Sequence, residues 1–371
     1  MRRWMVAGLS VALVACTEEP PEAAASGPDA VIESANPSRI AEQRYLRATA
    51  QAIAARDTPR DLAFAALLQQ AAALPAPVRP GDVVDATAAV PTDSFDATAQ
   101  AWRRRAAEGA GDDVIAHVLL TSGSARPDAV TFAAAARWAE LQPDNGAPWL
   151  MRLDLPVQAR LDAVAARPAF TSGAYPALRW MVDTLTQFPP PANLTGAPQR
   201  TGEDARDHAL SIAAMLVFSG VPTFKEILDA CPRGDRDTAP RCRAAADRLT
   251  QADTLLVRRL GDALLRRLPE PPADALASRE RAHAWQQQAL DGVVERIGEG
   301  RQTALILDPA IADEIAMRAR MFEEAGVSLE PPPDWIVPSR SPVPGPPHAM
   351  LDVPSIGPDR CASATSCSPV P

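Results

Sequence analysis

Histidine and acidic side chains are the first candidates for chemistry in this sequence, and their spacing supports no catalytic or metal site. The four histidines lie far apart, so no helix can present two imidazoles to one metal ion: His117, His208, His283 and His348. Asp204 and His208 are four residues apart and could form a hydrogen-bonded dyad. They lie in a charged run, however, that is typical of a solvated helix face. We therefore predict no catalytic residues, no metal and no cofactor.

The N-terminal residues carry the most specific pattern in the chain. Two arginines precede an apolar stretch over residues 4–14, which is too short to span a bilayer as a helix. The stretch ends in the tetrapeptide LVAC at 13–16, which resembles the lipobox of bacterial lipoproteins. The resemblance implies that residues 1–15 are a signal peptide and that the Cys16 thiol is lipidated. The alternative is an ordinary secretory signal with a cysteine there by chance.

A lipid anchor would hold the protein at a membrane surface. Residues 16–36 are rich in Glu, Pro, Ala and Ser, which predicts a flexible tether behind the lipidated cysteine. The residue after Cys16 is Thr17, whereas the resemblance associates Asp at this position with retention in the inner membrane. We therefore expect a lipid-anchored protein of the bacterial cell envelope, at the outer membrane and facing the periplasm.

Four further cysteines favour disulfide bonds, because disulfides persist in oxidising compartments outside the cytoplasm. Four cysteines allow three pairings. Closeness in sequence favours Cys231–Cys242 and Cys361–Cys367. Free thiols or a metal site are the alternatives, although no C-x-x-C motif and no suitably spaced histidine supports zinc.

Composition predicts an acidic, all-α protein. The net charge is −9, which disfavours nucleic acid as a partner. Hydrophobic residues make up 47% of the chain, enough to build a core. Abundant alanine and few β-branched runs favour helices over strands.

Helix-start signals recur between the tether and a proline-rich tail. Asn36-Pro37 and Thr58-Pro59 each place a capping residue before a proline at the first helical position. A break rich in proline divides an N-terminal helical-hairpin domain over residues 37–188 from a C-terminal helical domain over residues 201–327. The tail over residues 331–371 is expected to be irregular, because proline lacks a backbone donor.

The C-terminal domain is expected to contain a long antiparallel helix pair. The two helices cover residues 240–268 and 273–299, and a short proline-rich linker joins them. A capping box predicts an earlier helix over residues 202–219. The last helix is expected to begin at Asp308-Pro309.

One turn resembles the junction between two tetratricopeptide repeats. The sequence LQPDNGAPWL at residues 141–150 has Pro143 where the second helix of a repeat ends, and Trp149 at the fourth position of the next unit. Two later positions of that unit depart from the usual residues. The resemblance implies stacked, degenerate tetratricopeptide-like hairpins around residues 111–156, and the alternative is an ordinary helix-turn-helix.

Tryptophans and arginines are the remaining candidates for binding. Trp138, Trp149 and Trp180 could line a binding groove, although core packing is the default for large aromatics among many alanines. Arginine runs could clamp a phosphate or carboxylate. We expect instead that they form solvated helix faces with snorkelling stems: 103–105, 258–259 and 266–267.

Two classes of function follow from these observations. The first is a lipid-anchored helical scaffold that binds another envelope protein or peptide, since stacked helices form concave surfaces suited to such partners. The second is an envelope hydrolase that acts on peptidoglycan or peptides through paired carboxylates. We expect a binding protein rather than an enzyme, because no carboxylate pair is singled out by its spacing.

Overall fold

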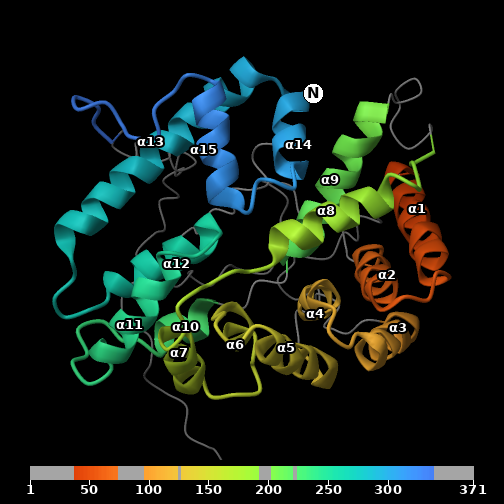
Figure 1. The fold of residues 1–371 in the computed structure, drawn as a ribbon, viewed down its shortest axis with the longest axis horizontal. Helices are drawn as coiled ribbons and strands as arrows, with labels where there is room; N and C mark the ends of the chain where they lie inside the picture. The colour runs from red at the N-terminus through yellow and green to blue at the C-terminus, as the bar shows by residue number, and fades with distance from the viewer. Residues whose placement is uncertain (1–36, 74–95, 124–126, 192–201, 220–223, 338–371) are drawn as a thin grey trace, which may run out of the picture. The chain divides into compact units, whose positions relative to one another are not determined.

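The computed structural model describes residues 37–73, 96–123, 127–191, 202–219 and 224–337. These residues form fifteen α-helices (Figure 1), and β-type pairing among them is limited to one isolated bridge between Asn145 and Ala169. The prediction of an all-α fold is confirmed. Within the described ranges, no helix combines the length and the apolar character that crossing a membrane requires.

The N-terminal part of the body is built around one deeply buried helix. α1 (Pro37–Ala54), α2 (Pro59–Ala71) and α3 (Ala97–Gly109) pack so that α2 contacts both of the others (Figure 1). All residues of α2 from Asp61 to Leu68 are buried. As predicted, α2 begins after Thr58, whose hydroxyl accepts a hydrogen bond from the Asp61 N–H at 3.2 Å.

Aspartate residues begin the three helices that follow α2. Asp96, Asp113 and Asp128 each accept a backbone hydrogen bond at the start of a helix. These helices are α3, α4 (Val114–Thr121) and α5 (Ala129–Leu141). Such caps satisfy N–H groups that have no partner within the helix, so they set where each helix begins.

Arg103 departs from the expected solvated face. It is 1% exposed, and it donates hydrogen bonds to Asp128 at 3.1 Å and to Thr131 at 2.8 Å. The prediction for the run 103–105 is therefore wrong at its first member. A guanidinium tolerates burial here because the cap carboxylate of α5 provides both an opposite charge and an acceptor.

The turn after α5 is held by the side chain of Asn145. Its amide donates to Thr171 O at 2.7 Å and accepts from Thr171 N–H at 2.9 Å. The helix that follows, α6 (Ala147–Leu150), is only four residues long, and α7 (Val157–Ala165) and α8 (Ala174–Leu185) come next. One turn of helix is too short to be an arm of a helical hairpin, so the repeat detail of the prediction is not confirmed.

The C-terminal helices differ from the prediction at the first member of the long pair. α9 (Gly202–Ser219) has the predicted bounds, and α10 (Phe224–Asp229) follows. The continuous helix predicted over residues 240–268 is wrong, because the chain forms α11 (Ala239–Leu249) and α12 (Leu255–Leu265) instead. α11 and α12 pack directly against each other.

Contacts with distant segments interrupt this helix, since no proline or glycine lies between α11 and α12. The Asp253 carboxylate accepts hydrogen bonds from both the N–H and the hydroxyl of Ser172 at 2.8 Å. The Leu255 N–H, at the start of α12, donates to the Glu314 carboxylate at 2.9 Å. Glu314 thus caps α12 from a position 59 residues further along the chain.

The last part of the body contains one helix that was not predicted. The long helix ends at Gly298, which has φ of +82°. The last helix is capped by Asp313 rather than Asp308, so its predicted start at Asp308-Pro309 is wrong. Asp313 accepts from the Ala316 N–H at 2.7 Å. Three helices result: α13 (Ala273–Ile297), α14 (Glu299–Leu307) and α15 (Glu314–Glu324).

The described residues from Pro37 to Pro332 belong to one unit, and those from Pro333 to Val337 belong to a second. One hydrophobic cluster in the first unit includes Met181 of α8 and Ala213 of α9, and α8 packs against α9. The helices predicted as two domains, 37–188 and 201–327, therefore share a core. Most of the tail over residues 331–371 lies outside the described residues.

Candidate functional site

A cavity of about 210 Å³ lies between α12, α13 and α15, which are labelled in Figure 1. It gathers three arginines, one histidine and one carboxylate together with apolar side chains. The lining residues are Thr250, Leu255, Arg258, Asp262, Arg279, Ala282, His283, Gln286, Ile315, Arg318, Ala319 and Leu329. A concave site with a few convergent polar groups and apolar walls is the usual form of a ligand site.

The three arginines come from three different helices. Arg258 lies on α12, and its Nε donates to Ala252 O at 2.6 Å. Arg279 lies on α13, and its Nε donates to the Asp262 carboxylate at 2.6 Å. The Asp262 residue is only 2% exposed, so this pair holds a buried charge on the cavity wall. Burial lowers the pKa of Arg258, although a guanidinium remains charged at any physiological pH.

Arg318 of α15 is the most deeply buried of the three, with a side chain that is 9% exposed. Its Nε lies 3.6 Å from Oε1 of Glu314, one helical turn earlier. Burial lowers the pKa of Arg318 and raises the pKa of Glu314. Two buried nitrogens at the site, Arg318 Nε and Arg279 Nη2, have no hydrogen-bond partner among the described residues. Both atoms have almost no accessible surface, and Arg318 Nε faces the Glu314 carboxylate.

His283 contributes a neutral ring to the cavity at pH 7. Its Nε2 lies 3.9 Å from Asp262 Oδ2, beyond hydrogen-bond distance. Burial lowers the pKa of His283 below its ordinary value. The positive charges of Arg259, Arg318 and Arg258 lower it further, and the negative charge of Asp262 opposes them.

A second carboxylate near the site has a shifted pKa but does not line the cavity. Burial raises the pKa of Asp253 to about 6. Its oxygen Oδ2 accepts both hydrogen bonds from Ser172, and the Ser172 hydroxyl accepts the Ala174 N–H at 3.2 Å at the start of α8. Ser172 thus links the first residue of α8 to Asp253 in the loop before α12.

The three tryptophans lie in separate surroundings. Trp138 is 2% exposed and its Nε1 donates to Gln142 at 2.9 Å, so it belongs to the core. Trp149 lies under the Arg167 guanidinium, 4.2 Å from its ring centroid. The Trp180 ring packs edge-on against Phe64, with centroids 5.7 Å apart. A groove shared by the three rings is not proposed further, because Trp138 presents almost no surface.

Several of the remaining candidates from the sequence lie partly or wholly outside the described residues. The His208 ring lies 6.0 Å from the Tyr45 ring, and the Asp204 side chain lies outside the described side chains, so the structure does not describe a contact between Asp204 and His208. Cys16, Cys361 and Cys367 also lie outside the described residues. Among the residues that the structure does describe, no group of three potential metal ligands is assembled.

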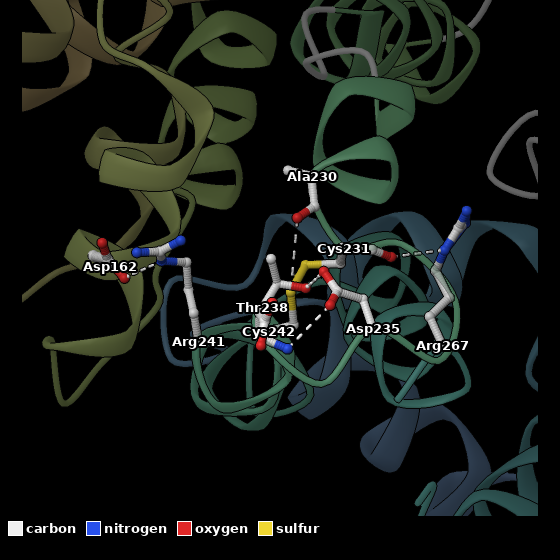
Figure 2. The surroundings of a disulfide bond; sticks show 9 residues. Asp162, Ala230, Cys231, Asp235, Thr238, Arg241, Cys242 and Arg267 are labelled. Atoms are coloured by element: carbon white, nitrogen blue, oxygen red, sulfur yellow. Dashed lines mark hydrogen bonds and ion pairs between the residues drawn. A yellow bond between two sulfur atoms is a disulfide. The ribbon is translucent and has the colours of Figure 1, made fainter. Parts of the chain in front are cut away.

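Cys231 and Cys242 form a disulfide, the pairing that closeness in sequence favoured (Figure 2). Their Cα atoms are 5.9 Å apart, and both residues are buried. Arg267 reinforces the enclosed loop, because its Nε donates to Cys231 O at 3.1 Å and its carbonyl accepts the Gly234 N–H at 2.8 Å. Figure 2 also shows Arg241, just before Cys242, paired with Asp162 of α7 at 2.6 Å.

Replacing both Cys231 and Cys242 by serine is expected to destabilise the body by about 3 kcal/mol, because the cross-link restricts a short loop in the unfolded chain. For a body of this size the melting temperature should fall by about 5 °C. Cys361→Ser with Cys367→Ser is the matched control, since both lie beyond Pro332, and it should leave the melting temperature unchanged. A disulfide-linked peptide that joins Cys231 to Cys361 or Cys367 would contradict the pairing.

Comparison with known proteins finds no matching family model, no matching curated protein and no matching solved structure. The site is therefore defined by its own geometry. Sequence reasoning missed it, because Arg258 was assigned to a solvated face. One signal was present: Glu314 and Arg318 lie at i and i+4 beside the apolar positions Ile315 and Ala319, a pattern that places an ion pair at the edge of a packed surface.

Proposed function

We propose that this chain is a lipid-anchored protein of the bacterial cell envelope whose helical body binds another envelope protein or peptide. The observation that carries the binding role is the cavity between α12, α13 and α15, whose charged wall consists mainly of arginine. Arginine does not exchange protons at physiological pH, and its planar guanidinium is suited to holding anionic or carbonyl groups. Such a wall favours binding over acid–base chemistry.

Two features of the cysteines support a location in the cell envelope. The lipobox-like residues 13–16 support lipidation of Cys16, and the buried Cys231–Cys242 disulfide suits an oxidising compartment. Thr17 supports the outer membrane, facing the periplasm, as the destination. The membrane contact in this proposal is the lipid itself.

A hydrolase that uses two carboxylates is less well supported by the cavity. Glycoside hydrolysis of that kind requires two facing carboxyl groups, one of them free to deliver a proton. The lining contains a single carboxylate, Asp262, and its oxygen is engaged by Arg279 at 2.6 Å. We therefore keep the binding role as the proposal.

Site-specific photocross-linking in the producing bacterium tests this role. A photoreactive residue at Gln286, which lines the cavity, is expected to form an adduct with an envelope protein or peptide. Gln288 is the matched control, because it has the same original side chain on the same helix but is exposed and outside the lining. The absence of an adduct at Gln286, or the same adducts at both positions, would contradict a binding role for this cavity.

A further inference from the structure

We propose that residues 328–332, which we call the strap, occupy a peptide-binding face of α13, and that an extended proline-rich peptide of another envelope protein binds there in place of the strap. The proposal rests on the proposed binding function and names the class of partner and the segment that controls access to it. Three observations support it: how the strap is held, what it covers, and which backbone groups it presents to α13.

Side chains of α13 hold the strap by its backbone carbonyls. Three of them donate a hydrogen bond to it: Arg281 Nη2 to Pro332 O at 2.5 Å, Trp285 Nε1 to Ser328 O at 2.9 Å, and Gln286 Nε2 to Leu329 O at 3.2 Å. Arg281 and Trp285 are four residues apart, so they lie on one face of the helix. Because the earlier of them bonds the later end of the strap, the strap runs antiparallel to α13.

The strap is not part of any backbone hydrogen-bond ladder. The last backbone–backbone hydrogen bond before it is donated by the Val327 N–H, and none within the described residues includes the strap itself. The Glu330 N–H donates to the Ser328 hydroxyl at 3.0 Å, inside the strap. Ser328, Glu330 and Pro332 are exposed. Hydrogen bonds at such positions compete with water and contribute little net free energy, so the strap can leave α13 without disturbing a helix.

Leu329 is the apolar anchor of the strap. It is half-buried, packs against the hydrophobic core, and lines the cavity between α12, α13 and α15. The strap therefore provides part of the cavity wall, and its departure opens the cavity along α13. A peptide that replaces the strap can place an apolar side chain where Leu329 lies.

The face of α13 recognises carbonyl groups rather than N–H groups. The side chains of Arg281 and Trp285 are donors without an acceptor, and Gln286 also donates to the strap. A backbone bound here needs carbonyl oxygens and no N–H groups. Proline meets this requirement, because it lacks the N–H and favours an extended backbone that costs little entropy to order. The strap itself ends in Pro331 and Pro332, and aromatic-lined faces commonly bind proline-rich peptides.

Fluorescence anisotropy of a labelled peptide with the sequence of residues 327–333, VSLEPPP, tests the exchange on the full-length chain in mild detergent. The wild type is expected to bind it weakly, because the strap occupies the face. Leu329→Ala removes the anchor of the strap, so the apparent affinity for the peptide should rise roughly tenfold. Ile336→Ala is the matched control, because it shortens an aliphatic side chain that is 83% exposed, and it should bind as the wild type does. Equal affinity of Leu329→Ala and the wild type would overturn the exchange.

A second variant tests the face of α13 itself. In the Leu329→Ala background, Gln286→Glu replaces the donor to the strap carbonyl by a carboxylate oxygen, and the affinity should fall roughly tenfold. Gln288→Glu is its matched control, because it makes the same change at an exposed position of the same helix, and it should have no effect. A peptide with alanine in place of the three prolines is expected to bind more weakly, and equal binding of the two peptides would overturn the preference for proline.

The two proposals can fail separately. If the peptide does not bind Leu329→Ala while the photoreactive residue at Gln286 still forms its adduct, the exchange is wrong and the binding function stands. If the peptide binds and no adduct forms in the bacterium, the face binds proline-rich peptides and the envelope protein as partner is wrong. If Leu329→Ala forms a dimer that the peptide dissociates, the occupant is the strap of a second copy, and the proposed partner is again wrong.

Discussion

A Cys16→Ser variant is expected to carry no lipid and to leave the membrane fraction completely. The thiol is the acyl acceptor in the lipobox resemblance, and a serine hydroxyl at that position provides no thioether. Each buried CH₂ of an acyl chain contributes about 0.8 kcal/mol of membrane affinity, so loss of all chains removes the entire anchor. Metabolic labelling with a fatty-acid analogue, followed by membrane fractionation, measures both effects.

The control for this variant is another cysteine that lies outside the lipobox. Cys361→Ser removes a thiol without touching residues 13–16, so its label and its membrane fraction should equal those of the wild type. Equal labelling of Cys16→Ser and the wild type would show that the chain is not a lipoprotein. In that case the alternative of a plain secretory signal peptide becomes the better interpretation of residues 1–15.

Gly261→Ala is expected to destabilise the body by about 3 kcal/mol, because α11 and α12 meet where Gly261 has no side chain. A Cβ at this position would lie 2.7 Å from Thr250 N and 2.9 Å from Ala246 O. Both are backbone atoms and cannot rotate away, so α12 would have to shift as a whole. Because α12 carries Arg258 and Asp262, the shift should also weaken ligand binding in the cavity. Urea unfolding monitored by circular dichroism measures the free energy of unfolding of the variant and the wild type.

Gly292→Ala is the matched control, since it makes the same change inside another helix. Among the described residues, no heavy atom lies within 4 Å of a Cβ built on Gly292 of α13. Alanine favours helix over glycine by up to about 1 kcal/mol, so this variant should be slightly more stable than the wild type. If both variants change the free energy of unfolding in the same direction and by a similar amount, the close approach at Gly261 does not govern the packing of α11 on α12.

Local signals in the sequence were sufficient for much of the fold. Thr58-Pro59 and the capping box before residues 202–219 placed their helices correctly, because caps involve residues within about one turn of each other. The Cys231–Cys242 pairing is local for the same reason, since the loop between these cysteines is short. The helix class itself followed from composition, because abundant alanine and few β-branched runs favour helices over strands.

The sequence by itself therefore determined the helical class, the helix starts at Pro37, Pro59 and Gly202, the cysteine pairing in the body and the lipobox-like N-terminus. Only the tertiary structure decided the path of the chain between Leu249 and Leu255, because Ser172 holds Asp253 in this segment and Glu314 accepts the Leu255 N–H at the start of α12. It also decided which arginines are buried. A helix face becomes interior only when another helix covers it, and no local spacing encodes which helix that is. Arg103 of α3, for example, is buried where it meets Asp128 and Thr131 at the start of α5.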